Sequence, residues 1–204
     1  MALRGDESEQ ASQPADSDTS NTQARSENTL NFASELVQIL AEDPSRDISV
    51  AAYPELHPES QNTQQDLHWL KHKLDQGASR AITQFFFSAD TFLKFRDEAV
   101  TAGISQQLVP GILPIHDIAK VQDFSAKCGA DVPVELVKRF SKATDKASMA
   151  DCAVEQCTTM VDKLHKEGVE SVHFYTLNQS ALCSRVCKEL TGVSEKLSPS
   201  HAAA

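Results

Sequence analysis

Residues 80–87 read RAITQFFF, a run of apolar and β-branched residues that contains one amide, Gln84. Short apolar runs of this kind are typical of strands that are buried on both faces of a parallel sheet. The flanks agree, because Gly77 closes a helix-like stretch before the run and Ser88-Ala89-Asp90 opens another after it. We therefore expect a βα unit here, and an amide near the end of a buried strand requires an explanation.

The same alternation of helix and strand patterns recurs along the chain. Pro110 lies inside one of the expected strands, where a proline predicts a bulge or an irregular strand end. Each expected strand is preceded by an expected helix and consists mostly of apolar residues, which indicates an α/β fold with a parallel sheet. The expected strands cover residues 47–53, 80–86, 107–114 and 171–177, and the expected helices cover 32–43, 63–76, 88–103, 117–127, 133–141, 147–167 and 180–191.

Polar residues cluster where each expected strand ends. They are Tyr53-Pro-Glu-Leu-His57, Gln84, Pro114-Ile-His116 and Tyr175-Thr-Leu-Asn178-Gln179. In a (β/α)8 TIM barrel these carboxyl ends carry the active site, and the GxGxxG and GxxxxGK[ST] loops of open sheets are absent from this sequence. A whole barrel has about 250 residues and eight strands, so we expect this chain to cover only about the C-terminal half of one.

Composition excludes several classes of function. The formal net charge is -10 and no Lys/Arg cluster is present, which argues against nucleic acid or an anionic membrane surface as a partner. The five cysteines lack a CxxC pair, so we expect reduced, mostly buried thiols and no metal site. His68 and His72 have the spacing of a zinc helix but lack the glutamate of HExxH, and a mixed helix face explains them better. Without an export signal or an apolar run of about 18 residues, the expected location is cytoplasmic.

Five motifs make the sequence more specific. They are Ala2-Leu-Arg-Gly-Asp6, Ile48-Ser-Val-Ala-Ala-Tyr-Pro-Glu-Leu-His-Pro-Glu59, Arg80-Ala-Ile-Thr-Gln-Phe-Phe-Phe87, Pro110-Gly-Ile-Leu-Pro114 and His173-Phe-Tyr-Thr-Leu-Asn178. Together and in this order they resemble the flavin-dependent methylenetetrahydrofolate reductases. The resemblance implies a TIM barrel with FAD at the carboxyl strand ends. It also implies hydride transfer from NADH or NADPH to the flavin and then to methylenetetrahydrofolate, giving methyltetrahydrofolate.

The resemblance also implies a division of the chain. Residues 1–6 match the end of a barrel strand, 7–29 form a flexible polar insertion, 30–191 carry the C-terminal βα units, and 192–204 are a disordered tail. The family's first-strand glutamate, which acts as the acid, has no match here. We therefore expect the isolated chain not to turn over. A truncated, non-catalytic remnant of the enzyme is the alternative, and a phosphate-binding aldolase is a weaker one. The oligomeric state, including a homo-oligomer, stays open.

Site residues follow from the same resemblance. Asp6 matches the aspartate beside flavin N1, where a negative charge tunes the reduction potential, and Gln84 matches the glutamine that contacts both pterin and nicotinamide. The residues matched to cofactor binding are Arg4, Gly5, Asp6, Ala33, Tyr53, His57, Asp66 and Lys73. Bland alternatives stay open: Asp6 as a helix cap, Asp66 and Lys73 as solvated helix residues, Ala33 in helix packing, and Gln84 satisfied by a strand-end backbone group.

Some positions depart from the family pattern or allow two interpretations. The departures are Phe32, His72, Lys120 and Gln179, and glutamine in place of the family's arginine at 179 loses a fixed cation that could pair with an anionic group. Phe124 could stack on a ligand ring or could serve core packing.

Overall fold

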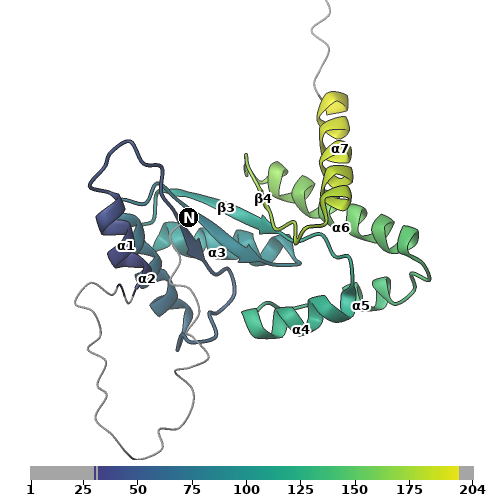
Figure 1. Cartoon of the computed structure of the whole chain (residues 1–204), viewed down its shortest axis with the longest axis horizontal. Helices are drawn as coiled ribbons and strands as arrows, with labels where there is room; N and C mark the ends of the chain where they lie inside the picture. Colours follow the sequence, from purple (N-terminus) through teal and green to yellow (C-terminus); the bar gives the residue numbers. More distant parts are fainter. Residues whose placement is uncertain (1–29, 31, 198–204) are drawn as a thin grey trace, which may run out of the picture.

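The protein is described from a computed structural model, which places residues 30 and 32–197. The elements in chain order are α1 (Ala33–Leu40), β1 (Ser49–Ala52), α2 (Thr63–Asp75), β2 (Arg80–Phe85), α3 (Ala89–Thr101), β3 (Gln107–Ile112), α4 (Ile118–Cys128), α5 (Val134–Phe140), α6 (Lys146–Lys166), β4 (His173–Phe174) and α7 (Ser180–Leu197). The four strands are parallel and lie in the order β1-β2-β3-β4 (Figure 1). The predicted α/β class with a parallel sheet is confirmed, and it is consistent with a TIM-barrel-type fold.

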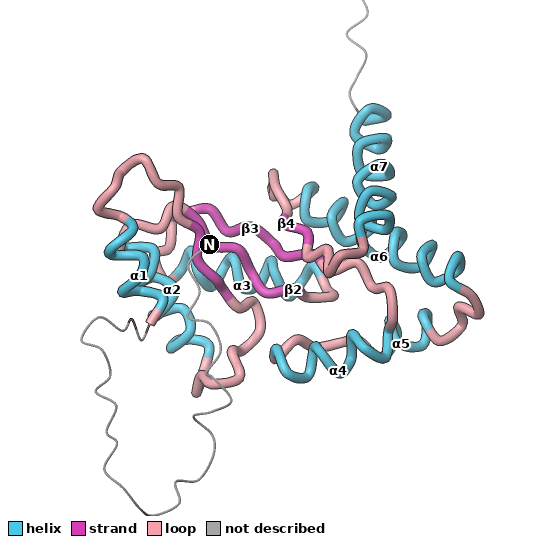
Figure 2. Tube along the Cα trace, in the orientation of Figure 1, coloured by secondary structure: helices cyan, strands magenta, loops and turns pink. Residues whose placement is uncertain are grey.

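Helix ends follow the chemistry that the sequence predicted. The Asn62 side chain accepts a hydrogen bond from the Gln65 N–H at the start of α2, and Gly77 with φ +118° follows its end. Gly129 takes the left-handed conformation after α4, with φ +71°. These residues stop the helices where the next segment must turn back, which sets the short connections seen in Figure 2.

Three apolar clusters join the helices to the sheet. The first lies between the β1–β2 side and helices α1 to α3 and includes Val50, Ala81 and Phe95. The second joins the end of β2 to α4 and α5 through Phe85 and Phe140, and the third joins β3 to α3, α6 and α7. Burial alternates along β2, with Ala81, Thr83 and Phe85 buried and the residues between them half-buried. Gln84 therefore points to the opposite face of β2 from Ala81 and the α1–α3 layer.

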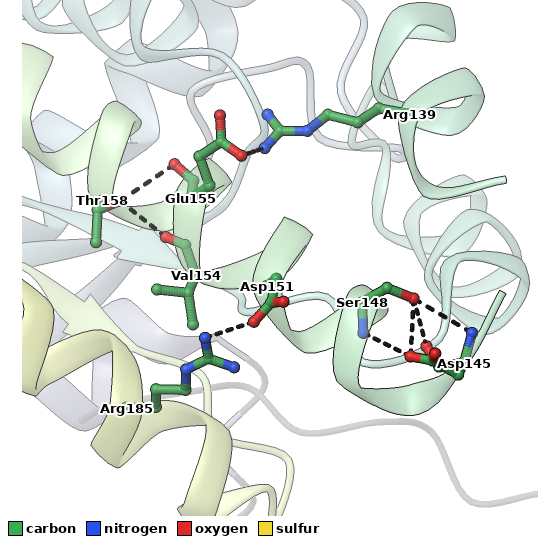
Figure 3. A network of polar contacts seen from close by, with 8 residues as sticks. All are labelled: Arg139, Asp145, Ser148, Asp151, Val154, Glu155, Thr158 and Arg185. Atoms are coloured by element: carbon green, nitrogen blue, oxygen red, sulfur yellow. Dashed lines mark hydrogen bonds and ion pairs between the residues drawn. The ribbon is translucent and has the colours of Figure 1, made fainter. Parts of the chain in front are cut away.

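Polar contacts tie α5, α6 and α7 together at the β4 end of the sheet. Figure 3 shows Arg139 of α5 paired with Glu155 of α6, and Asp151 of α6 paired with Arg185 of α7. Asp145 caps the start of α6 by accepting a hydrogen bond from the Ser148 N–H. α7 projects beyond the rest of the molecule (Figure 1). No helix within the described part of the chain is long and apolar enough to cross a bilayer.

The predicted elements differ from the structure mainly near the C-terminus. The prediction of a strand over residues 171–177 was wrong in extent, because β4 is only two residues long. Tyr175 adds one more backbone bond to Ile112, and then Leu177 and Asn178 turn the chain with positive φ. The last helix continues to Leu197 and does not end at 191. The divisions predicted for residues 1–6 and 7–29 lie outside the described residues, as do residues 198–204 of the predicted tail.

The five cysteines agree in part with expectation. All five cysteines are free, but only Cys157 and Cys183 are buried, so the prediction of mostly buried thiols holds for two of the five. Burial raises the pKa of the Cys157 thiol to about 12, which keeps it protonated and unreactive. Within residues 30 and 32–197, His, Cys, Asp and Glu side chains form no group of three that could hold a metal ion.

Candidate functional site

The ladder between β2 and β3 is interrupted where proline was expected to disturb it. Ile82 pairs with Val109, but the next pair is Phe85 with Gly111, so the register shifts between them. Pro110 has no N–H to donate at this point. Thr83 compensates, because its Oγ1 accepts a hydrogen bond of 2.9 Å from the Gly111 N–H and is fully enclosed. The predicted irregularity at Pro110 is confirmed.

Tyr175, which follows β4, also contacts the segment where the β2–β3 register is interrupted. Its hydroxyl donates a 2.9 Å hydrogen bond to the Thr83 carbonyl, and its ring lies over Gly111. A Cβ at residue 111 would lie 2.6 Å from Tyr175 Cε2 and 2.3 Å from the Thr83 oxygen, so only glycine fits. Burial, with a smaller contribution from nearby Tyr53, raises the pKa of the Tyr175 phenol. The hydroxyl therefore stays a donor through the physiological range.

Gln84 lies directly after this repaired segment. Its Oε1 accepts a 3.0 Å hydrogen bond from the Phe85 N–H, which matches the alternative in which a strand-end backbone group satisfies the amide. Among the described residues no group accepts a hydrogen bond from its Nε2, which leaves one end of the amide as an available donor. Gln84 and Phe85 share a small recess with residues from the loop that follows β1 (residues 53–62, here the β1 loop) and from the end of α4. These residues are Tyr53, Pro54, Glu55, Cys128, Gly129 and Ala130.

The other residues matched to the cofactor form a connected chain beside Gln84. The Tyr53 and His57 rings meet edge to face with centroids 4.3 Å apart. The His57 backbone N–H donates a 2.9 Å hydrogen bond to Asp66 Oδ2, and the Ser60 hydroxyl donates to Asp66 Oδ1. The Glu59 N–H donates to His57 Nδ1 at 3.1 Å, which assigns Nδ1 as an acceptor. Asp66 thus binds the β1 loop and is not a free helix residue.

Lys73 is the cation of this cluster. Its Nζ donates a 2.6 Å hydrogen bond to the carbonyl of Ala51, one residue before the end of β1. Burial lowers the pKa of Lys73 from 10.5 to about 8, although the charge of Asp66 acts in the opposite direction. The lowered pKa means that burial disfavours the charged form of Lys73. An anionic ligand would restore favourable interactions that water otherwise supplies, so the ammonium group is suited to bind one.

The β1 loop is also fixed to the turn between α4 and α5. Glu55 Oε2 accepts a 3.1 Å hydrogen bond from the Asp131 N–H, and Gly129 lets that turn approach the Leu56 carbonyl. Burial raises the pKa of the Glu55 carboxyl, because the Asp131 N–H only partly offsets the desolvation. The loop that carries Tyr53 and His57 is therefore held from two sides, by Asp66 and by this turn.

Phe124 of α4 lies at the edge of the same region. Its ring stacks on Phe85 with centroids 5.4 Å apart and an interplanar angle of 23°, yet 42% of the residue is exposed. One face therefore serves packing while the side chain still reaches the surface, so both predicted roles remain available to it. His116, at the end of the third predicted strand, is half-buried, and its Nδ1 contacts no hydrogen-bonding partner within residues 30 and 32–197.

Several predicted positions are not brought into this cluster. Arg4, Gly5 and Asp6 lie outside the described residues. Ala33 is the first residue of α1, and among the described residues no hydrogen bond or ring contact joins it to the others. Of the departures from the family pattern, Lys120 pairs with Asp117 on the surface, and Phe32 and Gln179 are exposed.

Another hollow lies at the opposite end of the sheet. A groove of about 510 Å³ opens between the α3–β3 and α6–β4 connections, with Phe92, Arg96 and Leu108 in its wall. Parallel βα folds carry their binding residues at the carboxyl strand ends, and conservation at the amino ends serves stability. We therefore assign the candidate site to the cluster around Gln84, Tyr53, His57, Asp66 and Lys73, in spite of the size of this groove. Sequence reasoning had not singled out Gly111 and Thr83, and Pro110 was the signal that could have revealed them.

Comparisons with known proteins find related sequences and a related fold. The family model for methylenetetrahydrofolate reductase matches residues 1–191. The 5,10-methylenetetrahydrofolate reductase of Pectobacterium carotovorum subsp. carotovorum is 44% identical over 164 residues, which is 78% of this chain and 54% of that protein. The Escherichia coli K12 protein of the same name is 42% identical over the same shares of the two chains. The chain thus spans about half the length of the curated relatives it matches.

A solved structure supports the fold independently. An uncharacterized protein from Clostridium thermocellum, described as binding two copies of 5-methyl-5,6,7,8-tetrahydrofolic acid, superimposes with a TM-score of 0.55. The alignment covers 79% of this chain and 59% of that one at 12% sequence identity. At this identity the likeness shows a common fold.

Proposed function

This chain belongs to the methylenetetrahydrofolate reductase family, and we propose that it forms part of an FAD-dependent oxidoreductase that reduces 5,10-methylenetetrahydrofolate to 5-methyltetrahydrofolate with NADH or NADPH. The observation that carries this proposal is the connected cluster of Gln84, Tyr53, His57, Asp66 and Lys73 at the carboxyl strand ends. Five positions matched through the family resemblance, three from β2 and the loop after β1 and two from α2, thus lie in one region.

The donor set of the cluster suits FAD. Lys73 supplies a partly desolvated cation for the phosphate part, and the Tyr53 and His57 rings offer flat apolar surface with polar edges. FAD, when bound, supplies the ability to accept a hydride from one substrate and pass it to another. Asp6, with Arg4 and Gly5, is proposed to lie beside the flavin ring, and its charge would discourage the build-up of negative charge there.

The remaining part of the proposal concerns the folate. Gln84 offers its free Nε2 as a donor next to the aromatic surface of Phe85 and Phe124. The solved neighbour of the same fold is described as binding 5-methyl-5,6,7,8-tetrahydrofolic acid, and we extend that ligand class to this chain. The cytoplasmic location and homo-oligomer formation stay predictions.

A second candidate is a non-catalytic remnant of the same enzyme. It is favoured by the sheet, because among the described strands β1 and β4 each pair with one neighbour and leave an edge. Binding and turnover are separate questions, and this candidate keeps the first while losing the second.

Titration of the purified chain with FAD tests the first question. We expect quenching of flavin fluorescence and a yellow protein after gel filtration, whereas a colourless protein contradicts the proposed cofactor site. Assay of 5-methyltetrahydrofolate formation with FAD, NADH or NADPH, and methylenetetrahydrofolate tests the second. No turnover is expected for the isolated chain, and measurable turnover would exclude the remnant.

Gln84→Glu tests the role of the amide. The substitution keeps the size and the Oε1 acceptor but replaces the Nε2 donor by an anion, so we expect 5-methyltetrahydrofolate binding to weaken at least tenfold and FAD binding to change less than twofold. Glu98→Gln, on the exposed part of α3, is the matched control. Unchanged folate affinity in Gln84→Glu would remove Gln84 from the substrate site.

A further inference from the structure

The two residues that flank Gln84 both contact Tyr175, which directly follows β4. The residue before Gln84, Thr83, gives its carbonyl to the Tyr175 hydroxyl at 2.9 Å. The residue after it, Phe85, meets the Tyr175 ring edge to face with centroids 6.2 Å apart. Tyr175 is 92 positions away from Thr83 in sequence, and it reaches β2 only because Gly111 leaves the crossing free.

Backbone pairing alone does not hold this part of β2. Pairing with β1 runs to Thr83, but the regular register with β3 ends at Ile82, and Pro110 offers no N–H across from the next residues. The Gly111 N–H bonds to the Thr83 side chain, and the Phe85 N–H bonds to the Gln84 side chain. In this segment the path of the strand thus depends on side chains, and the orientation of the Gln84 amide is coupled to that path.

We propose that Tyr175 is a positioning residue for Gln84, which holds the Thr83–Phe85 backbone so that Gln84 Oε1 stays on the Phe85 N–H and Nε2 points to the ligand. The inference rests on the proposed function for its ligand, a folate, and extends it to a residue that would act without touching the substrate. A purely structural role would lower stability but would not depend on Gln84.

A double-mutant cycle separates these roles. Tyr175→Phe keeps the ring against Phe85 and removes only the hydroxyl, so we expect a folded chain that binds 5-methyltetrahydrofolate about fivefold more weakly. In a Gln84→Ala background the same change should cost less than about 1.5-fold, because the group that it positions is gone. Equal losses in both backgrounds would overturn the proposal.

Nuclear magnetic resonance gives a readout that does not need the folate. The Gln84 side-chain amide signals, assigned by their loss in Gln84→Ala, should shift in Tyr175→Phe, and hydrogen exchange of the Phe85 N–H should accelerate at least tenfold. Thr101→Val is the control, because it also removes a hydroxyl bonded to a backbone carbonyl at 2.8 Å, but on exposed α3. Unmoved Gln84 signals and unchanged Phe85 exchange would overturn the positioning role.

The folate-binding cycle and the NMR measurements together separate failure of this inference from failure of the proposed function. If the wild-type chain does not bind 5-methyltetrahydrofolate, the folate proposal fails, while the Gln84 and Phe85 signals still decide the role of Tyr175. Should Tyr175→Phe not fold, Thr83→Val removes the acceptor of the Gly111 N–H and releases the same segment. The same changes at Gln84 and Phe85 are then expected, and their absence counts against the proposal.

Discussion

The two edges of the parallel sheet hold their polar groups in different ways. At the amino ends of the strands, Asp47 pairs with Arg80 and accepts a hydrogen bond from the Ser79 hydroxyl on an exposed surface. At the carboxyl ends, Thr83 is enclosed and Lys73 is desolvated. The Thr83 hydroxyl bonds to the Gly111 N–H, and the Lys73 ammonium bonds to the Ala51 carbonyl. Exposed pairs contribute little to stability, whereas enclosed polar groups are costly when a partner is lost. The polar groups of the carboxyl edge, where the candidate site lies, therefore depend more on their partners than those of the amino edge do.

Gly111→Ala is expected to produce the largest effect on this edge. The new methyl group would overlap the Thr83 carbonyl and the Tyr175 ring, and neither a backbone atom nor a ring wedged over the sheet can move away easily. We expect a loss of about 3 kcal/mol or more in the free energy of unfolding, measured by urea denaturation.

Gly192→Ala is the matched control for this substitution. Gly192 lies in α7, and apart from its own helix backbone and chain neighbours no described atom lies within 4 Å of the added Cβ, so alanine should stabilise the chain by about 0.5–1 kcal/mol. A loss below about 1 kcal/mol in Gly111→Ala would show that the slot for Tyr175 is not tight.

Lys73→Met is the next largest change and should have opposite effects on stability and binding. The folded chain releases the Lys73 proton near pH 8 and the unfolded chain near 10.5, so wild-type stability rises with pH between these values. Methionine keeps the apolar stem and removes this dependence. At pH 7 we expect a gain of about 2 kcal/mol, after allowance for the lost bond to Ala51.

FAD binding supplies the other half of this test. Without its cation the site should bind FAD at least tenfold more weakly, although the protein is more stable. Lys71→Met, two positions earlier on α2, removes an exposed ion pair with Asp75 and should change neither stability nor FAD binding appreciably. Two results would contradict the proposed cost of burying the Lys73 charge. One is a Lys73→Met chain that is less stable than the wild type at pH 7, and the other is a stability that still rises with pH between 8 and 10.5.

The regular parts of the molecule could be predicted from sequence because local rules decide them. Gly77 ends its helix where the pattern placed it, and alternation along β2 predicted that Gln84 faces away from its buried neighbours. Pro110 predicted the irregularity, since a missing N–H is a property of the residue itself. The matched residues Tyr53, His57, Asp66 and Lys73 also form one cluster in the structure.

What could not be predicted depends on contacts between distant residues. Nothing near Thr83 in sequence indicates that its carbonyl is bound by Tyr175, and nothing near Gly111 indicates which ring fills its space. The length of β4 also escaped prediction, because an apolar pattern does not reveal that the chain turns with positive φ at Leu177. Residues with a family match could be named from the sequence, whereas contacts that join distant residues could not.

The smallest effect concerns the hold on the β1 loop. The pKa of Glu55 is raised by burial, so the unfolded chain loses this proton at lower pH than the folded chain. Stability contributed by the neutral carboxyl is therefore present at acid pH and is lost as pH rises through the raised pKa. Glu55→Gln keeps an oxygen acceptor for the Asp131 N–H and removes the buried charge. We expect a gain of about 0.5 kcal/mol at pH 7, discounted because the side chain is only half-buried, and none below about pH 4.

Thermal melting of the wild type and Glu55→Gln between pH 4 and 8 checks this, with Glu135→Gln as the control because its carboxylate is exposed and paired with Lys138. The sign matters more than the size. A loss of stability at pH 7 would mean that the charge of Glu55 strengthens the bond to Asp131 by more than its desolvation costs. The carboxyl edge would then contain one anchor that does not sacrifice stability, and the contrast with the amino edge would rest on Lys73 and the Thr83–Tyr175 contact alone.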